Sequence, residues 1–142
     1  MQFLIRNYLK LLYLLALAGP IMMLIVRLWI ARVFWASGLV SISDWGNTIY
    51  LFTHEFSVPV LSPWLAAVSS TTFELACPVL LTIGLAARLA TLPLLAMTAV
   101  INFTYDNNIE HAYWAMLLGM ILFYGPGKLS VDYWINKRYA KA

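Results

Sequence analysis

The stretch IMMLIVRLWIARVFWASGLVSI, residues 21–42, decides the fold. At about 1.5 Å per residue, a helix of this length crosses a hydrocarbon core of about 30 Å. Two arginines, Arg27 and Arg32, lie inside this apolar run. A charge within a membrane segment must reach the headgroups or meet a partner inside the protein. The rest of the chain must therefore supply a partner for these arginines.

Composition places the chain among integral membrane proteins. Apolar residues make up 63% of it, charged residues only 11%, and the mean hydropathy is +0.81. In soluble domains about a quarter of the residues are charged. The pI of about 9.1 does not indicate a nucleic-acid partner, because the basic residues form no patch with interleaved polar side chains. The single cysteine, Cys77, excludes an internal disulfide and a CxxC motif.

Three further apolar runs predict three more membrane spans. They cover residues 64–85, 89–105 and 111–125, and short turns join the later ones. Spans joined by short connections pack as antiparallel neighbours, so we predict an all-α, up-down-up-down four-helix transmembrane bundle over residues 21–128. Residues 1–20 are predicted to form an amphipathic or partly inserted helix that Gly19-Pro20 breaks. The aromatic and basic tail, residues 129–142, suits a helix in the membrane interface.

The distribution of charge predicts the orientation. Seven basic residues fall on one side of the predicted bundle: Arg6, Lys10, Arg88, Lys128, Lys137, Arg138 and Lys141. The loops on the other side carry acidic residues and no Lys or Arg. By the positive-inside rule, we expect both termini in the cytoplasm.

The depth of charged residues within the predicted spans suggests a partner for the arginines. Arg32 and Glu74 both fall near the midplane of their predicted spans, and an unpaired charge there costs several kcal/mol. We therefore predict an Arg32–Glu74 pair, with Arg27 either extending toward the cytoplasm or joining Glu74 from below. Pro78 frees the carbonyl of Glu74 and predicts a kink, and the hydroxyls of residues 69–72 lie nearby. These groups favour either a small polar cavity or an ion pair that only fixes the helix register.

A second polar set is predicted on the outer face. His54 and His111 each adjoin a glutamate, Glu55 and Glu110, and Asp106 lies in the same loop as Glu110. Such residues can bind a metal or transfer a proton, but their spacing is no known ligand motif, and a histidine near Trp114 equally suits a headgroup anchor. We assign no metal. The spans hold no axial histidine for a haem, and the chain has no phosphate loop, nucleophile elbow or zinc-protease helix.

Several motifs resemble the DoxX-like family of small membrane proteins. They are RLWIARVFWASGL (27–39), DW (44–45), VPVLSP (58–63), FELACPVLLTIGLAAR (73–88), the His111–Trp114 pair and GPGKLSVD (125–132). The similarity covers about residues 21–135. Family members often carry a lysine soon after the SGL stretch, where this chain has Ser41 or Ser43. The positions that match the family are Arg27, Glu74, Arg88, Gly125, Pro126, Gly127 and Asp132.

The resemblance implies a four-span protein of the bacterial inner membrane. The family name derives from subunits of archaeal quinone-linked oxidoreductases, so quinone is the candidate cofactor, and a membrane or soluble oxidoreductase the candidate partner. We expect an accessory subunit of a membrane redox system rather than a complete enzyme. The alternative is a non-enzymatic binding or assembly protein that holds a lipid or a partner, with the bilayer and a second copy of the chain as further candidate partners and no nucleic acid.

Overall fold

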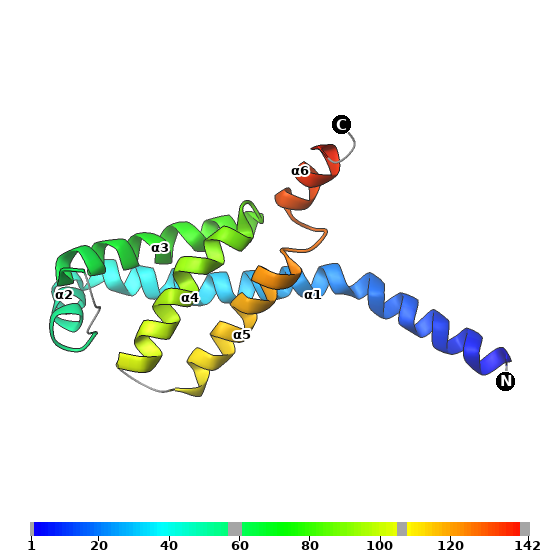
Figure 1. Ribbon diagram of the computed structural model, residues 1–142, viewed down its shortest axis with the longest axis horizontal. Coiled ribbons are helices and arrows are strands. Elements are labelled where there is room, and N and C mark those ends of the chain that lie inside the picture. The colour runs from blue at the N-terminus through cyan, green and yellow to red at the C-terminus, as the bar shows by residue number, and fades with distance from the viewer. Residues whose placement is uncertain (1, 57–60, 105–107, 140–142) are drawn as a thin grey trace.

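The computed structural model describes residues 2–56, 61–104 and 108–139, in which every regular element is a helix. The helices are α1 (Gln2–Ser43), α2 (Trp45–His54), α3 (Pro63–Ile83), α4 (Ala87–Thr104), α5 (Ile109–Tyr124) and α6 (Val131–Tyr139). Figure 1 shows α3 lying along α1, with α4 and α5 beside them and α6 standing away from the bundle. The predicted all-α class is confirmed. Within the described residues, α1, α3 and α4 are long and apolar enough to cross a membrane, and α5 is apolar but shorter.

The observed helices follow the predicted apolar runs closely. The bounds of α3, α4 and α5 lie within two residues of the predicted spans. One prediction for the N-terminal segment is wrong, because α1 continues through Gly19 and Pro20 without a break. A proline inside a helix removes one backbone hydrogen bond and bends the axis, but it does not require the helix to end. The N-terminal half of α1 projects from the bundle at an angle to the packed half (Figure 1).

Helix α2 occupies part of the stretch between the first two predicted spans. Asp44 caps it, because the Asp44 side chain accepts a hydrogen bond from the backbone N–H of Asn47 at 3.1 Å. Thr48 fixes the turn between α1 and α2, since its hydroxyl donates to the carbonyls of Ser41 and Asp44. The next helix, α3, begins with Ser62 as its cap and Pro63 in its first turn, an arrangement typical of helix starts.

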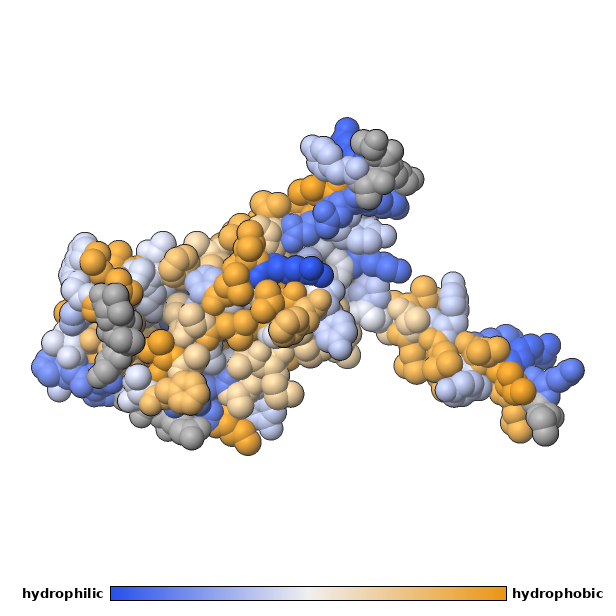
Figure 2. Space-filling view, viewed as in Figure 1, coloured by the Kyte–Doolittle hydropathy of each residue, from blue (hydrophilic) through white to orange (hydrophobic). Residues whose placement is uncertain are grey.

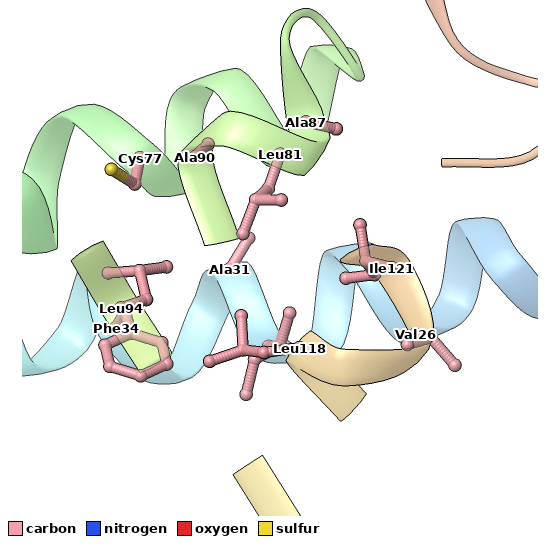
Figure 3. Packing of buried hydrophobic residues seen from close by; sticks show 11 residues of the cluster. Val26, Ala31, Phe34, Cys77, Leu81, Ala87, Ala90, Leu94, Leu118 and Ile121 are labelled. Carbon is pink, nitrogen blue, oxygen red and sulfur yellow. The ribbon is translucent and has the colours of Figure 1, made fainter. Parts of the chain in front are cut away.

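Apolar side chains from four helices form the core. On α1, Val26, Ile30 and Phe34 recur at four-residue intervals and so share one face. Around them pack Cys77 and Leu81 of α3, Leu94 of α4, and Leu118 and Ile121 of α5 (Figure 3). The core therefore joins α1, α3, α4 and α5 into one bundle.

Large apolar side chains also cover much of the outside of this bundle. Leu89, Phe103 and Phe123 are 68%, 86% and 79% exposed, and orange side chains cover much of the visible bundle surface (Figure 2). Hydrophilic residues gather at the ends of the bundle, on α6 and at the tip of α1 (Figure 2). A surface of this kind is stable against lipid rather than against water. The chain is a membrane protein.

Candidate functional site

Glu74 lies buried in the contact between α3 and α1, with 6% of its surface exposed. Ser37 donates a hydrogen bond to Glu74 Oε1 at 3.0 Å, and Ser41 donates to Oε2 at 3.2 Å. The two serines are four residues apart on α1 and so lie on one face of it. We call Glu74, Ser37 and Ser41 the Glu74 cluster.

Gly38 allows the two helices to approach closely at this cluster. A Cβ on Gly38 would stand 2.8 Å from Leu75 Cδ2 and 3.0 Å from the Cβ of Glu74. These distances are too short for a larger residue without movement of α3. The small residue between the two serines therefore brings the Glu74 carboxylate within hydrogen-bond distance of both.

Thr71 adds an unsatisfied polar atom to the same part of α3. It is 6% exposed, and its buried Oγ1 has no hydrogen-bond partner among the described residues. Residues three apart on a helix are neighbours on its surface, so Thr71 lies close to Glu74 along α3. Most buried hydroxyls in proteins have a partner, so Thr71 is an exception to that rule.

The predicted Arg32–Glu74 pair does not form. Arg32 is exposed beside Trp35, in a hollow whose other lining residues include Pro78 of α3. Glu74 lies level with Gly38, six residues and about 9 Å further along α1. The predicted pair assumed that equal distances from the ends of the two helices correspond to equal depths in the membrane. Six residues also turn the helix by about 240°, which places Arg32 on another side of α1.

Arg27 is buried at the other end of the α1–α3 contact, with 1% of its surface exposed. Its Nη1 donates to the carbonyl of Pro126 at 2.9 Å, and its Nη2 donates to the carbonyl of Leu129 at 2.8 Å. Gly84 ends α3 with φ at 76°, and a Cβ there would collide with Nη1 of Arg27. Arg27 therefore holds the segment after α5 against the turn between α3 and α4.

Asp132 fastens the same segment from its other side. Its Oδ1 accepts from the backbone N–H of Ala86 at 2.7 Å, and its Oδ2 accepts from that of Ala87 at 2.9 Å. The backbone N–H of Asp132 donates to the carbonyl of Gly84 at 2.9 Å. A carboxylate at a helix N-terminus is favourable because the helix dipole is positive there, and Ala87 begins α4. We call Arg27, Gly84 and Asp132 the turn-end cluster.

The predicted buried polar cluster thus divides into two separate sites. Arg27 belongs to the turn-end cluster and Glu74 to the Glu74 cluster, and Arg32 belongs to neither. Two matching positions of the family resemblance, Gly125 and Gly127, also lie near the turn-end cluster, each with a positive φ. Glu74 was singled out correctly as a buried group, but its serine partners were not predicted. Their signal in the sequence is the SGxxS spacing of small residues, Ser37, Gly38 and Ser41.

The outer-face residues do not converge on one site. The Nδ1 atom of His54 lies 3.1 Å from the carbonyl oxygen of Tyr50, and the ring stacks on Tyr50 at 4.4 Å. His111 packs edge-on against Trp114 at 5.0 Å. Glu55 is half-buried at the end of α2, Glu110 is exposed in the first turn of α5, and Asp106 lies outside the described residues. In the part of the chain that the structure describes, no three His, Cys, Asp or Glu residues gather as metal ligands.

A pocket that the sequence did not predict lies between α2, α3 and α4. Its volume is about 200 Å³, and we call it the aromatic pocket. Its lining includes Phe52, Phe56, Ser69, Ser70, Phe73 and Met97. Phe52 and Phe56 meet edge-on at 5.1 Å, one helical turn apart. The pocket was missed because it exists only where α2 folds over the contact between α3 and α4.

The two serines of the aromatic pocket differ in their bonding. The hydroxyl of Ser69 donates to the carbonyl of Ala66 at 3.1 Å, within its own helix. The hydroxyl of Ser70 has no hydrogen bond to any described residue. One hydroxyl in a largely apolar pocket therefore remains available to a ligand. Glu74 does not line this pocket.

Comparison with known proteins gives one match. The sequence model of the DoxX family matches residues 22–107, more than half of the 142-residue chain. The matched region includes both the Glu74 cluster and Arg27, and it ends before α5. No curated protein and no solved structure matches the chain.

Proposed function

The chain belongs to the DoxX family, and we propose that it is a four-span inner-membrane protein that acts as a quinone-binding accessory subunit of a membrane redox system. In this role the protein holds the quinone, and a partner oxidoreductase transfers the electrons. The observation that carries the proposal is the aromatic pocket with its available Ser70 hydroxyl.

The charge distribution supports the topology in this proposal. Arg88, Lys128, Lys137 and Arg138 all lie near the α3–α4 turn or on the segment that follows α5. Asp44, Glu55 and Glu110 lie near the other ends of the helices. The positive-inside rule then puts the α3–α4 turn and both termini in the cytoplasm, with α5 as the fourth span. The aromatic pocket opens in the outer half of the membrane.

The dimensions and lining of the aromatic pocket suit a quinone ring. An apolar cavity of about 150 Å³ in another protein takes up benzene, so a pocket of about 200 Å³ has room for one substituted ring. Phenylalanine rings pack well against a flat ring, either stacked or edge to face. The Ser70 hydroxyl can donate a hydrogen bond to a quinone carbonyl, and this bond gives the hydroxyl the partner that it otherwise lacks. Exposed Leu61 at the pocket leaves a path for an isoprenoid tail into the lipid.

The proposal is tested by quinone binding to the protein purified in mild detergent. We expect a bound quinone in organic extracts, identified by mass spectrometry, and saturable binding of a short-tailed ubiquinone. Replacing Ser70 with alanine should weaken this binding about fivefold, because one hydrogen bond contributes about 1 kcal/mol. Ser69→Ala is the matched control and should leave the affinity unchanged, since Ser69 already donates within α3.

A second reading of the same pocket is a binding or assembly role without redox chemistry. Its support is that the buried charges are used within the fold: Arg27 holds two carbonyls, and Glu74 accepts from two serines. In that case the aromatic pocket holds a lipid acyl chain or a partner side chain. Extracts that contain phospholipid but no quinone, together with equal ubiquinone binding by Ser70→Ala and the parent protein, would favour this reading and contradict the redox role.

A further inference from the structure

A second pocket lies at the α3–α4 turn, away from the aromatic pocket. Its volume is about 400 Å³, and it is surrounded by the start of α4, the end of α5 with the segment that follows it, and the first two turns of α6. Two basic side chains, Arg88 and Lys128, line it together with Tyr124, Tyr133 and Asn136. We call it the turn pocket. Its one acidic lining residue is Asp132.

The charge of Asp132 is not available to the two basic residues. Both of its carboxylate oxygens accept backbone N–H groups, at 2.7 and 2.9 Å, and its charge also interacts with Arg27. Neither the guanidinium of Arg88 nor the ammonium of Lys128 has an ion pair or a hydrogen bond with any residue in the described ranges. The turn pocket therefore has a net positive charge that the fold does not neutralise.

The position of Arg88 depends on a glycine. A Cβ on Gly125 would stand 3.0 Å from Nη2 of Arg88 and 3.4 Å from its Nε, so the guanidinium lies against the backbone of Gly125. Gly125 has φ at 86°, which favours glycine in any case. A guanidinium held against the backbone beside a pocket presents several N–H donors in a fixed plane, which suits the oxygens of a phosphate.

The residues around the turn pocket indicate that a phosphate bound there belongs to a lipid. Leu89 and Tyr124 line it and are 68% and 82% exposed, on helices whose outer surfaces are apolar. Tyrosine is typical of the level of lipid headgroups, and basic pockets at helix ends bind acidic headgroups. We propose that the turn pocket binds the phosphate of an anionic phospholipid between Arg88 and Lys128, with the acyl chains lying along α4 and α5. This binding does not depend on a quinone in the aromatic pocket.

The test compares lipid retention by the full-length protein in neutral detergent. Native mass spectrometry with phosphatidylglycerol and phosphatidylcholine should show tighter binding of phosphatidylglycerol to the parent protein. In Arg88→Gln/Lys128→Gln this preference should fall about tenfold, because each basic group near a headgroup contributes a several-fold effect. Lys137→Gln/Arg138→Gln removes the same charge from α6 outside the pocket, and it should keep the preference.

Three results would overturn the proposal. An equal loss in the two double variants would show that only the overall charge attracts the lipid. Retention of the preference by Arg88→Gln/Lys128→Gln would place the lipid elsewhere. Equal affinity for glycerol 3-phosphate and phosphatidylglycerol would identify the ligand as a free phosphate. Should the pocket double variant fail to fold, Lys128→Gln alone replaces it, because Lys128 is exposed and its partial loss of preference makes the same distinction.

Discussion

At the scale of single residues, Arg27 and Glu74, the buried charged side chains among the described residues, form their hydrogen bonds with uncharged groups. Arg27 donates to backbone carbonyls, and Glu74 accepts from serine hydroxyls. An ion pair is only one way to keep a charge out of contact with lipid, since hydrogen bonds to charged groups are also strong. The contacts of Glu74 predict which substitutions the cluster tolerates.

Replacing Glu74 with alanine should lower the free energy of unfolding by about 2–3 kcal/mol, because it leaves two serine hydroxyls unpaired and a cavity behind. Glu74→Gln should cost less than about 1 kcal/mol, since an amide of the same shape both accepts and donates hydrogen bonds. Denaturation in detergent would measure both. An equal loss in Glu74→Gln and Glu74→Ala would contradict this tolerance and show that the two serine hydroxyls need a carboxylate as their acceptor.

Gly84 offers a second prediction at this scale. Alanine there would strain a backbone with φ at 76° and collide with Arg27, so Gly84→Ala should cost at least about 2 kcal/mol. Gly119 in α5 is the matched control, because a Cβ there meets nothing within 4 Å. Gly119→Ala should stabilise the protein by up to about 1 kcal/mol, since alanine favours a helix interior. Thermal unfolding of both variants in one detergent would check the contrast, and similar unfolding temperatures would contradict it.

The sequence was enough to predict that Arg27 and Glu74 are buried, but it did not predict the groups that they contact. The burial of Arg27 and Glu74 followed from charges placed within apolar runs. The Arg32–Glu74 pair was wrong because the sequence gives no depth for one helix relative to another. The acceptors of Arg27 are carbonyls, which every residue carries and no sequence pattern marks. The serines at positions 37 and 41 were visible, but only the close approach at Gly38 makes them partners of Glu74.

At the scale of helices, apolar runs were enough to predict α3, α4 and α5, whereas α2 was missed. Residues 43–64 are rich in aromatic residues and contain two prolines, so their sequence shows no long apolar period. The cap at Asp44 is the local signal for α2, and it is weak by itself. Because the aromatic pocket needs α2, the candidate ligand site could not be derived from the predicted spans alone.

The caps of α4 and α2 can be compared by one substitution in each. Asp132 caps α4 from a distant part of the chain and is close to Arg27, so Asp132→Asn should cost about 1–2 kcal/mol by losing an acceptor and the charge. Asp44→Asn at the exposed start of α2 should lower the free energy of unfolding by only a few tenths of a kcal/mol, because asparagine caps helices as well as aspartate does. Hydrogen exchange should show faster exchange of the Ala86 and Ala87 amides in Asp132→Asn alone. Unchanged exchange there would contradict the cap.

At the scale of the whole molecule, the two ends of the chain relate differently to the bundle. The N-terminal half of α1 projects from it (Figure 1). The first buried residue of α1 is Val26. The C-terminal segment is short, yet it supplies the Leu129 carbonyl to Arg27 and the Asp132 carboxylate to the start of α4. The shorter of the two projecting parts therefore contributes more to the stability of the bundle.

Two truncations test this difference. A chain without residues 2–18 should unfold within a few degrees of the full chain, because its deletion removes no buried side chain of the described core. A chain without residues 129–142 should lose at least about 3 kcal/mol, since Arg27 becomes a buried charge with one acceptor fewer and α4 loses its cap. Both are measured by thermal unfolding in the same detergent. If the N-terminal deletion destabilised the protein as much, the exposed half of α1 would have to pack against a second copy of the chain, and the stability of the full chain would then depend on its concentration.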